Sequence, residues 1–233
     1  MKLAGADLLP DPSGALYWPE QRTLMVADLH LEKGSWFAKT GQPLPPYDSL
    51  ETLSRLEPLM ERWQPDRVVC LGDSFHDRDA AARLDPAARA VLARLQQGRE
   101  WIWVTGNHDP EPPIGLGGRA MLEMSLGPLH LRHEALTEPP LSGQAELSGH
   151  YHPKACVRVA GSRLSRPCFL LAGRRLILPA FGSYTGGLDV TDPALQAVVG
   201  SKFQVFLTGG ERLYGFSDQS VLARPVLARN PAR

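Results

Sequence analysis

Short apolar runs that end in polar residues recur along the first half of the chain. Residues 24–27, 67–71 and 101–104 each form such a run, and each predicts a buried strand. The polar residues follow directly after each run, where a strand would leave the sheet. This half of the chain is therefore expected to contribute at least three strands to one sheet.

Two helices are predicted between these strands. Leucines at three-to-four spacing over residues 50–63 predict the first of them. Asp48 and Glu51 stand three residues apart at its start, as a capping pair would, and Pro58 is expected to kink it. The second helix is predicted over residues 85–98, where an aspartate and a proline open the segment and a glycine closes it.

The second half of the chain has a different pattern. Beyond residue 110, short apolar segments follow one another with turn residues between them. They predict strands at residues 129–132, 146–148, 155–159, 168–171 and 175–178. Neither a linker nor an internal repeat interrupts the chain. We therefore predict a single α/β domain over residues 1–233, with a mobile tail after about residue 215.

The composition excludes several classes of protein. Of the 233 residues, 43% are hydrophobic, which is enough to bury a sizeable core. No apolar run approaches the roughly 18 residues of a membrane span. The three cysteines are too few and scattered for a disulfide framework, and the first residues lack the apolar stretch of a secretory signal. These features predict a reduced, cytoplasmic protein.

Side chains that bind metals follow each predicted strand. Six of the seven histidines lie in these positions, and only His130 is left over. The positions are Asp28 and His30, Asp73 and His76, Asn107 to Asp109, His133, and His150 and His152. Because ligands bind beyond the carboxyl ends of strands in open α/β sheets, we expect these residues to converge. If residues 149–152 are extended, the two histidines there face one side.

This set of donors predicts a centre with two metal ions. Carboxylates, an amide oxygen and imidazoles are too hard for copper(I) and too rich in nitrogen for calcium. About seven ligands exceed the needs of one tetrahedral ion but suit two divalent ions completed by water. Such pairs of ions recur in enzymes that hydrolyse phosphate esters, where a nearby protonated histidine can supply a proton to the leaving oxygen.

These motifs resemble those of the calcineurin-like metallophosphoesterase superfamily. The resemblance implies a four-layer α-β-β-α sandwich with two metals at the strand ends. It places Asp28, His30 and His152 on one metal and Asn107, His133 and His150 on the other, with Asp73 bridging them. It also makes His108 the proton donor or phosphate-stabilising residue and gives Asp109 the task of orienting its loop.

One position separates this chain from the protein phosphatases of the superfamily. His76 stands where their pattern has a second aspartate, and a histidine there resembles the double-strand-break repair nucleases. Residues 27–34, 44–48, 71–77, 127–129, 132–134 and 179–187 resemble the bacterial ligase-associated DNA damage response metallophosphoesterases. That resemblance implies a manganese-dependent phosphodiesterase or endonuclease acting on DNA, single-stranded or gapped, beside a DNA ligase, a helicase and an exonuclease. Iron, zinc and nickel stay open as metals.

The glycine-rich loop at residues 179–187 is expected either to close over the site or to be a structural turn. In the first case, Tyr184 or Lys33 would touch the substrate.

The sequence leaves several alternatives for the substrate and for the role of the protein. The 25 basic and 25 acidic side chains give zero net charge, which argues against holding nucleic acid by charge alone and favours small phosphodiesters, nucleotides or phosphoproteins. A non-catalytic repair scaffold is the third alternative. A group of arginines in the β half is either a DNA-facing patch or a solvated face. Its members are Arg158, Arg163, Arg166, Arg174 and Arg175.

Overall fold

A six-stranded sheet organises the first half of the molecule. The computed structural model describes residues 1–42, 44–111, 113 and 115–222. The strands of this sheet, in spatial order, are β3 (Leu9–Pro10), β4 (Leu16–Trp18), β5 (Thr23–Val26), β6 (Arg67–Leu71), β7 (Glu100–Val104) and β8 (Arg119–Met121). From β5 to β8 all neighbours are parallel, so their carboxyl ends lie along one edge of the sheet.

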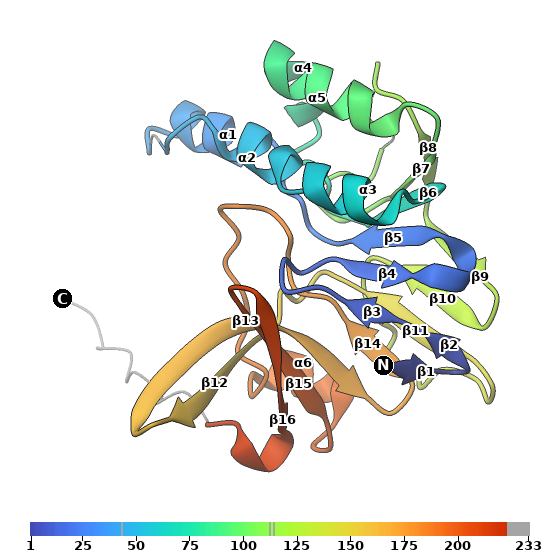
Figure 1. The fold of residues 1–233 in the computed structure, drawn as a ribbon. Helices are drawn as coiled ribbons and strands as arrows, with labels where there is room; N and C mark the ends of the chain where they lie inside the picture. Colours follow the sequence, from blue (N-terminus) through green and yellow to red (C-terminus); the bar gives the residue numbers. More distant parts are fainter. Residues whose placement is uncertain (43, 112, 114, 223–233) are drawn as a thin grey trace.

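Helices cover one face of this sheet (Figure 1). They are α1 (Lys33–Lys39), α2 (Asp48–Ser54), α3 (Glu57–Trp63), α4 (Ala80–Arg83) and α5 (Pro86–Gln96). Leu53 of α2 and Leu92 of α5 are fully buried in one cluster with Val68 and Trp103 of the sheet. The leucine spacing in the sequence is thus explained by burial of one helix face against the strands.

A second sheet contains eight strands. Along its main path it runs β16 (Arg212–Ser217), β15 (Gln204–Gly209), β13 (Ser162–Ala172), β14 (Arg175–Ile177), β11 (Ala145–Ser148), β10 (Leu129–Arg132) and β9 (Glu123–Leu126). The remaining strand, β12 (Lys154–Val159), pairs with β13. Strands β10, β11 and β14 are parallel to one another. A short hairpin of β1 (Lys2–Leu3) and β2 (Ala6–Asp7) precedes both sheets.

The two sheets pack face to face. Met25 and Ile102 of the first sheet share a fully buried cluster with Leu131 and Leu147 of the second. On the outer face of the second sheet, α6 (Pro193–Val199) packs through Leu195 into a third cluster. The mixed α/β class predicted from the sequence is confirmed. Within the described residues, α6 is the α-helix packed outside the second sheet, whereas five α-helices cover the first.

The capping pair predicted at Asp48 and Glu51 is wrong. Tyr47 is the N-cap of α2 and makes no side-chain capping bond, while the Asp48 carboxylate accepts the Gly34 N–H at 3.1 Å. Asp48 therefore connects α2 to α1 rather than closing its own helix. The helical segment is interrupted between α2 and α3, and Pro58 lies in the first turn of α3, where its missing N–H costs no helical hydrogen bond.

The start of the predicted tail has regular secondary structure, and its mobility stays a prediction. Residues 215–217 complete β16, which pairs with β15, and a 3-10 helix, η2 (Asp218–Ser220), follows. The rest of the predicted tail, residues 223–233, lies outside the described residues. Another 3-10 helix, η1 (Pro19–Gln21), precedes β5. No described helix is long and apolar enough to cross a membrane.

Candidate metal centre

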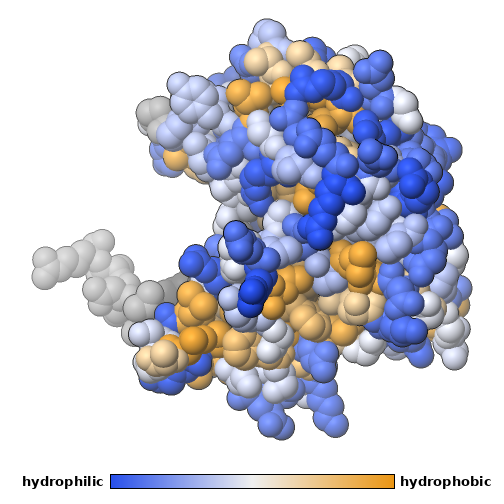
Figure 2. Space-filling model, viewed as in Figure 1, coloured by the Kyte–Doolittle hydropathy of each residue, from blue (hydrophilic) through white to orange (hydrophobic). Residues whose placement is uncertain are grey.

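The predicted ligands come from both sheets and lie beyond the carboxyl ends of parallel strands. Asp28 and His30 follow β5, Asp73 follows β6, and Asn107 follows β7. The second sheet contributes His133, which directly follows β10, and His150 and His152, which follow β11. On this side of the molecule the surface is hollowed between the part that carries α1 and α2 and the part that carries β12 and β13 (Figure 2).

The first donor group consists of Asp28, His30 and His152. His152 Nε2 lies 3.3 Å from Asp28 Oδ1 and also 3.3 Å from His30 Nε2. These three side chains form a cluster whose donor atoms all lie within 4.8 Å of one another. His30 Nε2 also lies 3.9 Å from Asp73 Oδ2, so the group borders a fourth oxygen donor.

The second donor group consists of Asn107, His133 and His150. Asn107 Oδ1 lies 3.0 Å from His133 Nε2 and 3.1 Å from His150 Nδ1, and these two nitrogens are 3.0 Å apart. Asp73 Oδ2 lies 3.4 Å from His133 Nε2. Because the same Asp73 oxygen borders both groups, its carboxylate is placed to be shared between two ions.

The chemistry of these contacts fits cations. His133 Nδ1 lies 3.1 Å from the Leu71 carbonyl, which can only accept, so Nδ1 carries the proton and donates. In the neutral imidazole, Nε2 is then a lone-pair donor aimed at the cluster. Lone pairs that converge at about 3 Å repel one another unless a proton or a metal ion lies between them. The residues present therefore fit two divalent ions.

Left-handed backbone is concentrated at the ligands. Ten described residues other than glycine have a positive φ, and five of them are predicted ligands. These are Asp28 (+54°), His30 (+44°), Asp73 (+45°), His150 (+67°) and His152 (+46°). Such conformations cost roughly 1–3 kcal/mol each and persist where the surrounding structure enforces them, often at functional sites.

The extended conformation considered for residues 149–152 is wrong. These residues form a loop between β11 and β12, and the positive φ values of His150 and His152 redirect the chain at each step. As a result, the two imidazoles do not share one face of a strand. His150 joins Asn107 and His133, whereas His152 joins Asp28 and His30.

Two glycines allow the ligands to approach the backbone. A Cβ at Gly72 would lie 2.2 Å from His133 Nδ1, and one at Gly149 would lie 2.5 Å from Asp28 Oδ2. Contacts this short do not occur for real side chains, so either substitution must displace a ligand. The glycine in each motif is therefore required by the packing of the site, and not only by a turn.

A buried carboxylate holds the loops after β6 and β7 together. Asp109 accepts the backbone N–H groups of Ser74 at 2.8 Å, Phe75 at 3.1 Å and Gly106 at 2.9 Å. Burial and the nearby charge of Asp73 raise the pKa of Asp109 to about 7, while the three N–H groups oppose that rise. The geometry agrees with the predicted role of Asp109 in orienting its loop.

The charge states of Asp73 and His30 favour binding of a cation. Burial favours the neutral form of Asp73, but the His133 imidazole and the His108 N–H outweigh it and hold the pKa of this carboxyl below its ordinary value. Burial, followed by the nearby His152, lowers the pKa of His30 to about 2, so its ring is neutral. Ionised carboxylates and neutral imidazoles are the forms that coordinate metals. His133 differs: burial opposes its charge, but Asp73 and Asp28 raise its pKa to about 9, so this ring must lose a proton to bind an ion.

Comparison with known proteins agrees with this reading of the site. The family model described as calcineurin-like phosphoesterase matches residues 21–157, which is more than half of the chain. The chain belongs to this family. Members of the family bind two divalent metal ions, as the two donor groups require.

Solved structures similar to this phosphoesterase include a nuclease. The crystal structure of the Pseudomonas putida nuclease MPE matches with a TM-score of 0.69 and 28% identity, over 93% of this chain and 98% of that one. Yfce, a phosphoesterase from E. coli, matches at 13% identity and a TM-score of 0.43, over 84% of this chain and 98% of that one. Among curated protein sequences, none matches this chain significantly.

His108 and His76 stack at the edge of the first donor group. His108 Nδ1 lies 2.8 Å from the His76 carbonyl and must donate to it, which leaves Nε2 as the other ring position. The two rings are 5.2 Å apart with planes 21° from parallel. His76 Nδ1 lies 3.4 Å from His30 Nδ1, so His76 contacts the side of His30 that faces away from the donor group.

The two predicted substrate contacts lie in different places. Lys33 lies in a hollow beside His76 and His108, and burial lowers the pKa of its ammonium group. Tyr184 lies closer to α2, where the charges of Asp48 and Glu51 add to a pKa rise led by desolvation. The structure leaves the role of Tyr184 as a prediction.

The loop that carries Tyr184 is anchored in the phosphoesterase. Phe181 N–H donates to the Ala27 carbonyl and Gly182 N–H to the Asp28 carbonyl. Ser183 N–H donates to Thr52 Oγ1 of α2 at 3.1 Å. The loop therefore supports the backbone of the first ligand segment, which agrees with the structural-turn alternative, and its closure over substrate stays a prediction.

The five arginines of the β half do not form one patch. Arg175 is buried, pairs with Glu146 at 2.7 Å and also donates to the Leu136 and Glu138 carbonyls. It therefore holds loops together inside the protein and cannot face DNA. Arg158 and Arg163 are exposed opposite each other at the end of the β12–β13 hairpin.

Sequence reasoning missed Trp36 and Phe37 of α1, which line the hollow beside His76. The signal that could have found them is two adjacent aromatic residues six and seven positions after His30, in a segment otherwise rich in polar and small residues.

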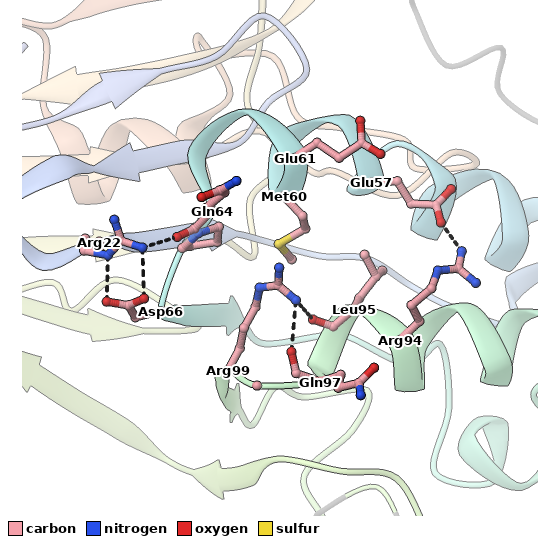
Figure 3. A pocket seen from close by; sticks show the side chains of 12 residues that line it. Arg22, Glu57, Met60, Glu61, Gln64, Asp66, Arg94, Leu95, Gln97 and Arg99 are labelled. Atoms are coloured by element: carbon pink, nitrogen blue, oxygen red, sulfur yellow. Dashed lines mark hydrogen bonds and ion pairs between the residues drawn. The ribbon is translucent and has the colours of Figure 1, made fainter.

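A larger hollow, of about 540 Å³, lies elsewhere, between the ends of α3 and α5 (Figure 3). Four of its charged groups form two ion pairs: Arg22 pairs with Asp66, and Arg94 pairs with Glu57. We assign no chemistry to it.

Proposed function

We propose that this phosphoesterase is a manganese-dependent nuclease that hydrolyses phosphodiester bonds of DNA during repair, in the cytoplasm. The observation that carries the proposal is the pair of donor groups joined by Asp73, with the stacked His76 and His108 beside them. The nuclease MPE, similar over nearly the full length of both chains, supports a nucleic acid as the substrate class, and DNA follows from the sequence resemblance.

Each donor group would hold one of the two metal ions. Asp28, His30 and His152 would hold one ion, Asn107, His133 and His150 would hold the other, and Asp73 would bridge them. When bound, the two ions supply charge neutralisation at the phosphate and an activated water for attack.

His108 would supply a proton to the leaving oxygen. Its Nδ1 is committed to the His76 carbonyl, so Nε2 is the nitrogen that can carry a proton to the leaving oxygen. The backbone N–H of His108 donates to Asp73 Oδ1 at 2.9 Å, which ties the position of this ring to the shared carboxylate. Stacking on His76 limits the orientations that the ring can adopt.

The test is a comparison of substrates with protein stripped of metal and reloaded with manganese. Bis-p-nitrophenyl phosphate, p-nitrophenyl phosphate, and single-stranded, gapped and duplex DNA are offered in turn. We expect diester hydrolysis and DNA cutting that require manganese and are preferred on single-stranded or gapped DNA. Iron, zinc and nickel reloading identifies the metal that supports most activity.

Small phosphodiesters are the second candidate substrate. The zero net charge of the chain favours them, because a small substrate needs no extended basic track. Diester hydrolysis without cutting of any DNA form would support this candidate. No hydrolysis of any substrate, with metal bound, would instead favour a non-catalytic scaffold.

The proposal extends to a DNA ligase, a helicase and an exonuclease as working partners, on the basis of the sequence resemblance. Size-exclusion chromatography of the phosphoesterase mixed with each purified partner tests direct binding. Separate elution of all components would limit the association to a shared pathway.

A further inference from the structure

A hollow of about 470 Å³ adjoins the metal centre, and its aromatic residues Trp36 and Phe37 have no role in the reaction described above. One wall is the part of α1 that carries Lys33, Trp36 and Phe37, and the loops with His76 and His108 form the other. Its volume falls within the roughly 300–1,000 Å³ of sites that bind small molecules. It is large enough to hold a chemical group of the substrate.

The hollow is continuous with the reaction site. Asn107 lines it and also belongs to the second donor group. His108, the proposed proton donor, lines it as well. A group seated in the hollow is therefore next to the phosphate that reacts, and in a nucleic acid the next group is a nucleoside.

The α1 wall is aromatic. Trp36 remains 36% exposed, with its ring 5.1 Å from the His76 ring and nearly perpendicular to it. Phe37 lies 6.2 Å from His76 with the two rings 18° from parallel. His76 thus fills the space between the aromatic wall and His108. An exposed indole beside a reaction site offers a flat apolar surface on which a base can stack.

Positively charged side chains at the margin of the hollow suit the phosphates of a nucleic-acid strand. Lys33 is half-buried between the hollow and the donor groups, and its charge is felt at both His30 and His76. Arg78 stands at the opposite margin, 3.8 Å from Glu111 with both side chains about 70% exposed. Asp77, the acid in the lining, is held by two hydrogen bonds from Arg83.

The position of α1 is fixed before any substrate arrives. The Asp48 carboxylate of α2 accepts the Gly34 N–H, and Ser49 Oγ accepts the Glu32 N–H at 2.8 Å and donates to the Glu32 carboxylate at 2.9 Å. These bonds are buried. The aromatic wall is therefore preorganised, which reduces the entropy lost on binding.

We propose that this hollow binds one unpaired nucleobase beside the scissile phosphate, stacked on Trp36, with Lys33 near an adjoining phosphate. The inference rests on the proposed phosphodiesterase function and narrows its substrate to strands with unpaired bases. A base inside a duplex is stacked and paired on both sides, so it must first leave the helix to reach Trp36.

Two esters with the same leaving group test the subsite. Thymidine 5′-(p-nitrophenyl phosphate) and methyl p-nitrophenyl phosphate break the same bond, and only the first carries a base. In Trp36→Ala we expect kcat/KM for the thymidine ester to fall about 5- to 150-fold, the equivalent of a stacking energy of roughly 1–3 kcal/mol. The value for the methyl ester should change less than twofold.

Matched variants isolate the role of the ring. Trp36→Phe keeps a stacking surface and should restore most of the preference for thymidine. Tyr214→Ala removes another half-exposed aromatic ring, 51% exposed on β16, and should leave both esters unchanged. On DNA, Trp36→Ala should reduce cutting of single strands more than cutting of duplex. Thermal melting confirms that each variant is folded.

Two results would overturn the subsite. Equal losses on the two esters in Trp36→Ala would show a general effect on the site, and no loss on the thymidine ester would show that the ring is not used. A failure of the proposed DNA function gives a different result, in which the wild-type protein hydrolyses both esters and cuts no DNA. In that case the ratio of kcat/KM for the two esters, compared between wild type and Trp36→Ala, still tests the subsite.

Discussion

The two edges of the first sheet both carry charged side chains but arrange them differently. At the amino ends of β6 and β7, Arg22 pairs with Asp66 and Arg67 pairs with Glu100. At the carboxyl ends, imidazole nitrogens and carboxylate oxygens converge on the two donor groups. Opposite charges that satisfy one another stabilise a surface, whereas convergent lone pairs need a cation from outside. One edge of the sheet thus contributes ion pairs to stability, and the other edge holds the side chains that can bind metal.

The largest effect is expected where both donor groups meet. Asp73→Asn removes the charge shared by the two groups but keeps the shape of the side chain. Hydrolysis of bis-p-nitrophenyl phosphate should fall below detection, and metal content should drop, while thermal melting shows a folded protein. Unchanged turnover in this variant would contradict the assignment of Asp73 as a shared metal ligand. It would also contradict the proposed difference between the two edges of the sheet.

Loss of the proton donor should have the next largest effect. His108→Ala is expected to slow hydrolysis about 10²- to 10⁴-fold, the usual contribution of general acid–base catalysis. The loss in rate should be greater for DNA, whose alkoxide leaving group needs a proton, than for a p-nitrophenyl ester, whose leaving group needs none. Rates on both substrates at one pH check this, and equal losses would argue against His108 as the donor.

A smaller effect is expected from the carboxylate behind the ligands. Asp109→Asn keeps one oxygen for the N–H groups of Ser74 and Phe75 but turns an amide toward Gly106. Replacing a residue that orients a metal ligand typically lowers metal affinity or activity about 10- to 100-fold. Metal titration of stripped protein measures the change. An affinity equal to that of the wild type would show that the loops hold their positions without Asp109.

The smallest effect is expected at the amino edge. Glu57→Gln breaks the pair with Arg94 in the hollow of Figure 3, where both side chains are partly exposed. Exposed ion pairs contribute only about 0–1 kcal/mol to stability, and metal content and hydrolysis should be unchanged. Chemical denaturation and the diester assay check both. A clear loss of activity would mean that this edge is coupled to the metal centre.

The local pattern was a good guide to the elements near the site. Strands at residues 67–71 and 129–132 agree with β6 and β10 residue for residue, and the helix predicted from residue 85 is α5, with Asp85 as its N-cap. These are cases in which burial of one strand or helix face and a local capping bond decide the structure. Where a side chain bonded a distant segment instead, as Asp48 does, the local prediction failed.

The sequence by itself predicted the candidate ligands, because a metal centre at strand ends requires donors directly after each apolar run. Their grouping was implied by the family resemblance, and only the tertiary structure shows the contacts that bring each group together. His30 and His152 meet although they are 122 positions apart, and His150, two residues from His152, belongs to the other group. Packing of the two sheets and the left-handed turns of the ligand loops bring about this division. Both depend on contacts between distant segments, which no local pattern of hydrophobic and polar residues encodes.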